Sequence, residues 1–253
     1  MEFDRARIEP YLSTIEQLPI GRPLSKHDLL IPELRLHQSG NLEIYYVPFD
    51  YWKPKAKLLI VGITPGWTQM ELAYRSLVAA IAQHKSWSER YGVVEQAASF
   101  AGAMRTNLIT MLDALGIPQH LGLSSSEPLF GESHHLVNTT SVIRYAVFVD
   151  SRNYTGSQPK LLKHPELLTY VKGVFAEELR QVPNALIIPQ GKAVQAVLEY
   201  WIQTGELDRD RCLLHFPHAS GANGHRQKFF DAAKAEMRIQ VENWFQVTAA
   251  AVG

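Results

Sequence analysis

The stretch Lys57-Leu58-Leu59-Ile60-Val61-Gly62 decides the fold, and it runs directly into the turn Ile63-Thr64-Pro65-Gly66. A short aliphatic run bounded by glycine and proline is typical of a strand that is buried on both faces of a parallel sheet. Helical patterns follow at about residues 69–83 and 94–115. The sequence therefore predicts a strand, a tight turn and helices at this point of the chain.

The same alternation continues along the chain. Segments typical of strands come at residues 42–47, 135–141, 185–189 and 211–215, a polar loop carries residues 153–156, and segments typical of helices come at about 165–181, 191–201 and from 224 onwards. This alternation predicts the α/β class, as a single domain of three α/β/α layers around a central, mainly parallel sheet. Ligands bind at the carboxyl ends of parallel strands. The turn after Val61, Asn138 and the loop after Leu214 are expected to lie at such ends and to converge.

Composition and charge narrow the function classes. The 253 residues carry 25 basic and 25 acidic side chains, so net charge does not indicate a nucleic-acid partner. Locally, the segment from His215 to Lys228 contains three histidines, Arg226 and no acid, which suits either a phosphate-binding surface or a solvated face. The single cysteine, Cys212, excludes an intramolecular disulfide and a four-cysteine cluster.

The chain shows no feature of membrane insertion. It has no apolar run of about 18 residues, and its first residues lack the basic and then apolar layout of a signal peptide. We expect a cytoplasmic protein that does not bind membranes. We expect a monomer that needs no cofactor. No metal is expected either, because the histidines show no spacing typical of a metal site.

Three motifs, in order, resemble the active-site motifs of the uracil-DNA glycosylase superfamily. They are Gly62-Ile63-Thr64-Pro65-Gly66, then Asn138 within Val137-Asn138-Thr139-Thr140, then His218-Ala219-Ser220-Gly221. The resemblance covers roughly residues 57–235 and implies a uracil-DNA glycosylase-like fold for the single domain 1–253. It also implies that DNA is the partner, in single- or double-stranded form, with a pyrimidine nucleotide flipped out of the strand.

The resemblance implies a catalytic role for His218. Hydrolysis of the bond between base and deoxyribose leaves negative charge on the departing base, and a neutral imidazole in a water-poor pocket stabilises that charge as it develops. The alternative is a surface or packing histidine. In the resemblance Asn138 reads the base through its carboxamide, whereas a strand-end asparagine that binds turn backbone groups is the competing interpretation.

The resemblance places further contacts around this site. Ser220, Gly221, His225 and Arg226 would meet a DNA phosphate, although a plain strand-to-helix loop would explain the same residues. Gly62, Ile63, Pro65, Gly66, Trp67 and Asn153 would line the base pocket. Trp67 could equally pack against its own helix, and Gly66 could serve only the backbone of a tight turn.

The turn also departs from the family pattern. Thr64 stands where the family commonly has an Asp or Asn that orients the attacking water, and a hydroxyl can hold a water but cannot act as a base near neutral pH. Another acid could orient the water in place of Thr64, and the candidates are Asp50, Glu71 and Asp150. The alternative for each is a solvent-facing or capping carboxylate. Gly66 replaces the bulky tyrosine of the uracil-restricted branch and leaves room beside C5 of the base.

These implications lead to one leading hypothesis and two alternatives. The first is a monofunctional DNA glycosylase that removes a uracil-like or C5-modified pyrimidine and leaves an abasic site, for DNA repair or for antiviral defence against modified viral DNA. The second is a catalytically silent DNA-binding module with the same fold. The third is another α/β nucleotide-binding enzyme that shares only the sheet.

Overall fold

The computed structural model describes residues 1–100, 102–221 and 223–250. Their contacts divide the chain into two compact units that alternate along the sequence. Unit 1 holds Met1–Trp52, Thr64–Ser99 and Ile143–Glu177, and unit 2 holds Lys53–Ile63, Phe100–Val142 and Glu178–Gly253. The sequence analysis expects one domain, and each compact unit here is built from three separate stretches. The chain passes from unit 2 to unit 1 between Ile63 and Thr64, inside the first motif.

Unit 1 combines short helices with two antiparallel sheets. Its strands are β1 (Glu2–Phe3), β2 (Arg35–Ser39), β3 (Leu42–Tyr45), β4 (Tyr51–Trp52), β7 (Ala146–Val149) and β8 (Arg152–Asn153). Its helices are α1 (Arg5–Ile8), α2 (Leu12–Glu16), α3 (Lys26–Leu29), α4 (Trp67–Ala82), α5 (Trp87–Ala98) and α8 (Pro165–Tyr170). The sheets have the strand orders β1-β4 and β2-β3-β7-β8. The strand expected at residues 42–47 and the helix expected at 69–83 are confirmed as β3 and α4.

The hairpin of β7 and β8 corrects the loop expected around Asn153. Phe148 pairs with Asn153 and Val149 with Arg152. Asp150 and Ser151 between them have φ values of 50° and 59°, which is the left-handed pair that a two-residue hairpin turn requires. Asn153 is therefore a strand residue. The sequence hides this turn because Asp-Ser replaces the usual Asn-Gly.

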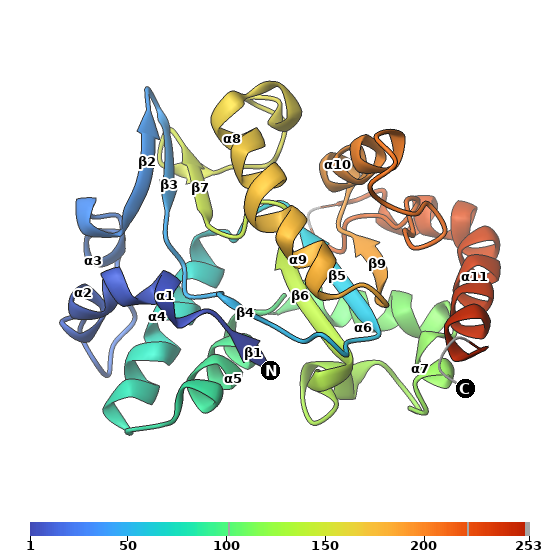
Figure 1. Cartoon of the computed structure of the whole chain (residues 1–253), viewed down its shortest axis with the longest axis horizontal. Helices are drawn as coiled ribbons and strands as arrows, with labels where there is room; N and C mark the ends of the chain where they lie inside the picture. Colours follow the sequence, from blue (N-terminus) through green and yellow to red (C-terminus); the bar gives the residue numbers. More distant parts are fainter. Residues whose placement is uncertain (101, 222, 251–253) are drawn as a thin grey trace. The chain divides into compact units, whose positions relative to one another are not determined.

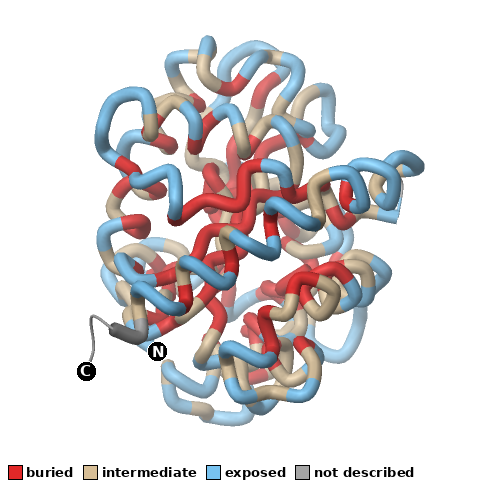
Figure 2. Tube along the Cα trace, turned by 90° about the vertical axis from the view of Figure 1, so that its right-hand side faces the viewer, coloured by how far each residue is buried: buried red, intermediate tan, exposed pale blue. Residues whose placement is uncertain are grey.

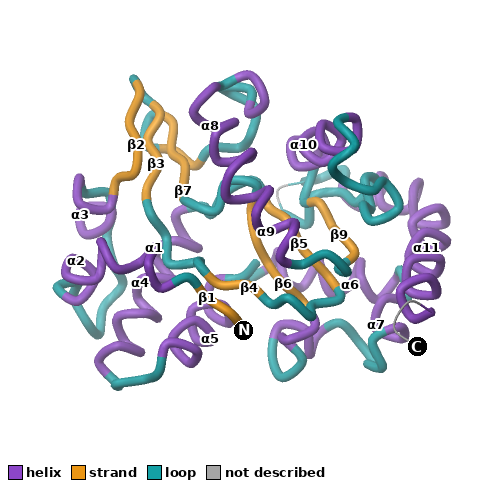
Figure 3. Tube along the Cα trace, in the orientation of Figure 1, coloured by secondary structure: helices purple, strands orange, loops and turns teal. Residues whose placement is uncertain are grey.

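Unit 2 is built on the parallel sheet β6-β5-β9. Its strands are β5 (Leu58–Gly62), β6 (Val137–Ser141) and β9 (Leu186–Pro189), and its helices are α6 (Ala103–Ala114), α7 (Ile117–His120), α10 (Lys192–Gln203) and α11 (Arg226–Ala250). Helix α9 (Ala176–Gln181) crosses from unit 1 into unit 2 and continues α8 through a π-helical turn at Val171–Phe175. The α/β class and the mainly parallel sheet are thus confirmed (Figure 1). Figure 3 shows the three strands side by side.

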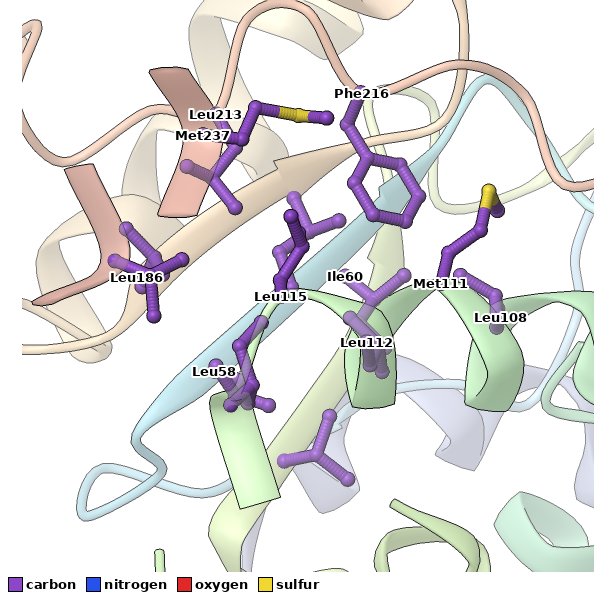
Figure 4. Packing of buried hydrophobic residues seen from close by; sticks show 14 of the residues in the cluster. Leu58, Ile60, Leu108, Met111, Leu112, Leu115, Leu186, Leu213, Phe216 and Met237 are labelled. Carbon is purple, nitrogen blue, oxygen red and sulfur yellow. The ribbon is translucent and has the colours of Figure 1, made fainter. Parts of the chain in front are cut away.

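An apolar cluster covers one face of this sheet. Leu58 and Ile60 of β5 lie against Leu108, Met111 and Leu112 of α6, and all five are almost completely buried (Figure 4). Phe230, Met237 and Val241 of α11 extend the same cluster. All of β9 and the first four residues of β5 are buried, and Figure 2 marks such stretches in red. Strands that are apolar at every position are buried on both faces, as the opening motif predicts.

Two expected elements are wrong. The helix expected at residues 94–115 is two helices, α5 and α6, because Phe100 (φ 46°) and Gly102 (φ 70°, ψ −145°) between them have positive φ values, which a continuous helix cannot contain. The strand expected at 211–215 is a single bridge between Ile187 and Cys212. After that bridge the chain turns, because the Leu214 amide donates to Cys212 O and the Phe216 amide to Leu213 O.

The strand expected at 135–141 begins later, at Val137, and this shift moves Asn138. In the parallel register Leu59 pairs with Asn138, Val61 with Thr140 and Gly62 with Ser141. The expectation that Asn138 lies at a carboxyl end is therefore wrong: it is the second residue of β6, and Ser141 occupies the carboxyl end. A strand residue rises about 3.3 Å, so Asn138 lies about 10 Å before that end.

Candidate active site

His218 lies in the loop that precedes α11 and packs on Gly191, which lies two residues after the end of β9 and directly before α10. A Cβ atom on Gly191 would lie 3.1 Å from His218 Cβ and 3.2 Å from its Cδ2. Gly191 has φ 90° and ψ 173°, a conformation that is essentially restricted to glycine. The absence of a side chain at Gly191 thus lets the imidazole lie against the carboxyl end of β9.

The hydrogen bonds of His218 determine which ring nitrogen carries the proton. The Ser220 backbone amide donates to Nδ1 over 3.0 Å, so Nδ1 is an acceptor and is unprotonated. A neutral imidazole then carries its proton on Nε2. Burial lowers the pKa of His218 below its usual 6.5, because a low-dielectric environment disfavours the charged ring. His218 is therefore a neutral hydrogen-bond donor near pH 7.

Gln190 joins the His218 loop to the ends of two strands. Its backbone amide donates to Val61 O over 2.8 Å, and its side-chain Oε1 accepts from the Ala219 amide over 3.1 Å. The residue is completely buried, yet its Nε2 has no hydrogen-bond partner within the described chain. A buried polar group without a partner costs free energy and needs an explanation. Sequence analysis missed Gln190, although its position directly after a buried strand could have indicated it.

The rest of the loop is held by side chains of unit 2. Asn223 Nδ2 donates to His218 O over 3.1 Å and Asn107 Nδ2 to Ala219 O over 2.8 Å. Arg226 Nη1 donates to Ser220 O over 2.9 Å. His225 is exposed, and a Cβ atom on Gly221 would meet nothing within 4 Å. The predicted DNA-contacting residues therefore lie together at the entry to α11.

Gly62 lies at the same end of the parallel sheet. A Cβ atom there would lie 3.2 Å from Ser141 Oγ on β6, and Gly62 O accepts from the Val142 amide over 2.9 Å. Ile63, the next residue, is half-buried. Because Gln190 binds both Val61 and Ala219, unit 2 brings the Gly62 end of β5 and the His218 loop together, as expected from the two motifs.

Asn138 is part of a buried polar network instead. Its Oδ1 accepts from the Lys53 amide over 3.1 Å, and its Nδ2 donates to Glu178 Oε1 over 2.8 Å. Glu178 also accepts from Thr140 Oγ1 over 2.6 Å, which holds α9 on the face of β6 opposite the apolar cluster. Asn138 is completely buried, so both ends of its carboxamide are engaged in holding the sheet and helix together.

In unit 1, Thr64 is bound to β7 through its hydroxyl. Oγ1 donates to Tyr145 O over 2.6 Å and accepts from the Val147 amide over 3.0 Å. A hydroxyl has one hydrogen to donate and two lone pairs, so one acceptor position remains. Thr64 can receive a hydrogen bond from a water there but has no second proton to offer it.

Gly66 and Asn153 form the start of α4. Asn153 Oδ1 accepts from the Trp67 amide over 2.9 Å and so satisfies a free amide of the first helical turn. A Cβ atom on Gly66 would lie 3.1 Å from Asn153 Nδ2. The space beside Gly66 is therefore occupied by the Asn153 carboxamide, and Trp67 is the half-buried first residue of the helix, after the buried Pro65.

Of the three acids weighed as substitutes at the water position, Asp50 and Glu71 are engaged within unit 1, and Asp150 is an exposed turn residue. Asp50 is completely buried and accepts from Tyr46 and Tyr145 over 2.7 and 3.1 Å. Burial raises the pKa of its carboxyl, against the opposing charge of Arg144 at 3.5 Å. Glu71 accepts from the Leu24 amide and pairs with Arg75. Asp150 lies in the turn between β7 and β8.

Other parts of the described chain hold no predicted site residue. A groove of about 390 Å³ in unit 2 lies between α11 and the 208–215 segment, beside Leu214 and Trp244, and none of the predicted residues lines it. Within the described ranges, no three His, Cys, Asp or Glu side chains are grouped so that they could hold a metal ion. Among the same residues, no helix combines the length and apolar character that crossing a membrane requires.

Fold and site together define a mixed α/β protein whose parallel sheet carries a half-buried, neutral histidine beside the carboxyl ends of β5 and β9. No family model and no solved structure matches the chain. The chain is 42% identical over 246 residues to the "Uncharacterized protein YoxB" of Bacillus subtilis (strain 168), across 96% of this chain and 95% of YoxB. It therefore belongs to the family of YoxB.

Proposed function

We propose that the protein is a monofunctional DNA glycosylase that hydrolyses the N-glycosidic bond of a uracil-like or C5-modified pyrimidine and leaves an abasic site. The single observation that carries the proposal is the hydrogen bond from the Ser220 amide to His218 Nδ1. It leaves a neutral imidazole with its proton on Nε2, at the end of a parallel sheet where ligands bind. A uracil-DNA glycosylase-like fold is part of the same proposal, and DNA is the proposed partner.

The chemistry requires a donor and does not require a charged acid. The bond between C1′ and the base breaks and the base leaves with the electron pair. A water oxygen bonds to C1′, and the proton that it gives up neutralises the released base anion. Negative charge on a pyrimidine oxygen grows only as the bond breaks, so a hydrogen bond from His218 Nε2 is strongest in the transition state. A fixed neutral donor contributes without any change in its own protonation.

Gln190 is the amide that we assign to the flipped base. Asn138 already uses both ends of its carboxamide on Lys53 and Glu178, whereas Gln190 Nε2 is buried and has no partner among the residues that the structure describes. A pyrimidine carbonyl oxygen would accept the hydrogen bond that this group lacks. Gln190 would then hold the base beside the same loop that carries His218.

The water and the C5 side of the base are assigned to the turn after β5. The free acceptor position on Thr64 Oγ1 can hold a water but cannot remove its proton, so we propose weak assistance at this step. In the resemblance the Gly66 position faces C5 of the base, and within unit 1 the polar Asn153 carboxamide lies beside Gly66. A polar C5 group such as a hydroxymethyl should therefore be preferred over a methyl. Both DNA repair and defence against modified viral DNA would use this preference.

A substrate panel tests the proposal. Duplex and single-stranded oligonucleotides that carry uracil, 5-hydroxymethyluracil, thymine or 5-hydroxymethylcytosine are incubated with the protein, and abasic sites are cleaved by heating in alkali. We expect cleavage on at least one base and its loss in His218→Ala. His215→Ala, an exposed histidine of the same segment, is the matched control and should keep full activity.

The second candidate is a catalytically silent DNA-binding module. It is favoured by Thr64, whose hydroxyl is already bound to Tyr145 O and to the Val147 amide, and by the engagement of Asp50 in a buried network. Tight DNA binding with no abasic sites on any substrate of the panel would support the module and contradict the glycosylase. Absence of both DNA binding and cleavage would contradict both.

A further inference from the structure

Phe229 on α11 is a large apolar side chain that the fold leaves in solvent. Its neighbour Phe230 is buried in the core, with its ring 6.2 Å from that of Phe216. Phe229 itself is 48% exposed. Exposed apolar residues are common singly, but an aromatic ring among cations beside a candidate site has a specific use.

A lysine and a histidine lie beside the Phe229 ring. Lys192, the first residue of α10, places Nζ 5.8 Å from the ring centroid. The His225 ring lies 6.1 Å away in an edge-on arrangement. From His215 to Lys228 the sequence contains no acid. The ring therefore lies beside a cation and next to an acid-free segment of the chain, and Lys192 matches the charge of a phosphate backbone.

This surface is attached to the His218 loop at two points. Lys192 directly follows Gly191, on which His218 packs. Arg226, in the same helical turn as Phe229, donates to Ser220 O over 2.9 Å. Phe229 and Lys192 thus lie at the same end of the unit 2 sheet as the candidate active site.

We propose that Phe229, Lys192 and His225 form a stacking platform for a DNA strand, in which Phe229 stacks on an unpaired base next to the target nucleotide, Lys192 contacts its phosphates and the His225 ring lies beside Phe229. The proposal rests on the proposed function only in taking DNA as the partner. Proteins that bind single strands combine an aromatic ring, which accepts the face of any base, with cations along the backbone. Excision of one base requires local strand opening, and this platform would hold the neighbouring base.

The test measures fluorescence anisotropy of a labelled single-stranded oligonucleotide and of a duplex with one abasic site, over a series of salt concentrations. We expect Phe229→Ala to weaken binding of the single strand about tenfold and Phe229→Tyr to restore it, because tyrosine keeps the aromatic face. Lys192→Gln should flatten the salt dependence by about 0.7 in the slope of log affinity against log salt. Ile239→Ala and Arg238→Gln, exposed apolar and cationic controls on the same helix, should bind as the unaltered protein does.

The outcomes separate this inference from the glycosylase proposal. Loss of affinity in Phe229→Ala without any excision by the unaltered protein supports the platform and contradicts the enzyme. Excision with unchanged DNA affinity in Phe229→Ala overturns the platform and leaves the enzyme standing. Failure of the unaltered protein to bind DNA overturns both. Binding to phosphatidylserine vesicles that depends on Phe229, with DNA binding unchanged, assigns the surface to a membrane and also overturns the platform.

Discussion

Two glycines in this molecule each face a functional candidate, and they do so in different ways. Gly191 in unit 2 has a positive φ of 90° and would direct a Cβ at His218. Gly66 in unit 1 has φ −82°, which any residue adopts, and would direct a Cβ at the tip of the exposed Asn153 side chain. At Gly191 both the backbone conformation and the packed His218 side chain resist a substitution. At Gly66 the exposed Asn153 side chain can move to make room.

The difference shows where the geometry of the proposed reaction is built. In unit 2 a buried glutamine, a left-handed glycine and a backbone amide all determine the position of one imidazole. In unit 1 the turn is held by a capping asparagine and by the Thr64 hydroxyl. We infer that positioning of the donor depends on contacts within unit 2, whereas the contacts of the Gly66 turn lie within unit 1. The substitutions below test this contrast.

Gly191→Ala should have the largest effect. The conformation of Gly191 costs about 1–3 kcal/mol for another residue, and the new Cβ must displace His218. We expect the free energy of unfolding to fall by that amount in chemical denaturation. The single-turnover rate of base excision should fall about 10- to 100-fold, because small displacements of a catalytic group are costly. An unchanged rate would show that the imidazole has room to move.

Gln190→Met should come next. Methionine has a similar length but cannot accept from the buried Ala219 amide, and an unsatisfied buried amide costs about 1–3 kcal/mol. Denaturation should show this loss. Gln190→Glu keeps the acceptor for Ala219 and lacks the donor that we assign to the base only while its carboxylate is ionised, so excision by this variant should slow as the pH rises. Full activity of Gln190→Glu would remove Gln190 from the base contact.

Asn153→Ala should have a smaller effect. It removes the acceptor for the Trp67 amide at the start of α4, a loss of the size of a helix cap, about 1 kcal/mol. Thermal unfolding measures it. Excision of 5-hydroxymethyluracil should decrease relative to uracil, because the polar group beside C5 is lost. Equal rates on both bases would place Asn153 outside the pocket.

Gly66→Ala should have the smallest effect. Its backbone conformation suits alanine, and only the exposed tip of Asn153 must move. We expect stability to change by no more than about 0.5 kcal/mol and excision to change less than in Gly191→Ala. A collapse of activity comparable to that of Gly191→Ala would contradict the contrast between the two glycines.

The sequence predicts those parts of the fold that are specified locally. The aliphatic run before Gly62 predicts β5, and the patterns that follow predict α4 and the parallel arrangement. The break at Phe100 could not be foreseen, because a left-handed phenylalanine is forced by tertiary packing. The same holds for the β7–β8 turn, whose Asp150 and Ser151 lack the glycine that usually marks it.

The candidate site shows the same division. The motif around His218 can be read from the sequence, and so can its chemistry. The hydrogen bond from Ser220 that selects the tautomer depends on the loop conformation. Asn138 matches the motif, but a strand that begins at Val137 and a buried Glu178 from a distant helix decide what its amide binds. The position of Gln190 after a buried strand can be read from the sequence, but its two hydrogen bonds and its unpartnered Nε2 are seen only in the described structure.

The pH dependence of stability follows from His218. Its pKa is lowered by burial in the folded protein, so the unfolded chain binds a proton more readily. Above the pKa of His218 in the unfolded chain, about 6.5, the group is neutral in both states and does not affect stability. As the pH decreases from 6.5 through the lower pKa of the folded protein, protonation of the unfolded chain reduces the free energy of unfolding. Urea unfolding of the unaltered protein and of His218→Gln should diverge over that range, with the variant less sensitive to acid.

The tautomer of His218 tests the central claim most directly. Nitrogen-15 NMR of the imidazole side chains distinguishes Nδ1–H, Nε2–H and the charged ring, and the spectrum of His218→Gln identifies the signal among the 10 histidines. We predict a neutral ring at pH 7 with its proton on Nε2 and a titration midpoint below 6.5. A proton on Nδ1, or a charged ring at pH 7, would contradict a neutral Nε2 donor to the departing base.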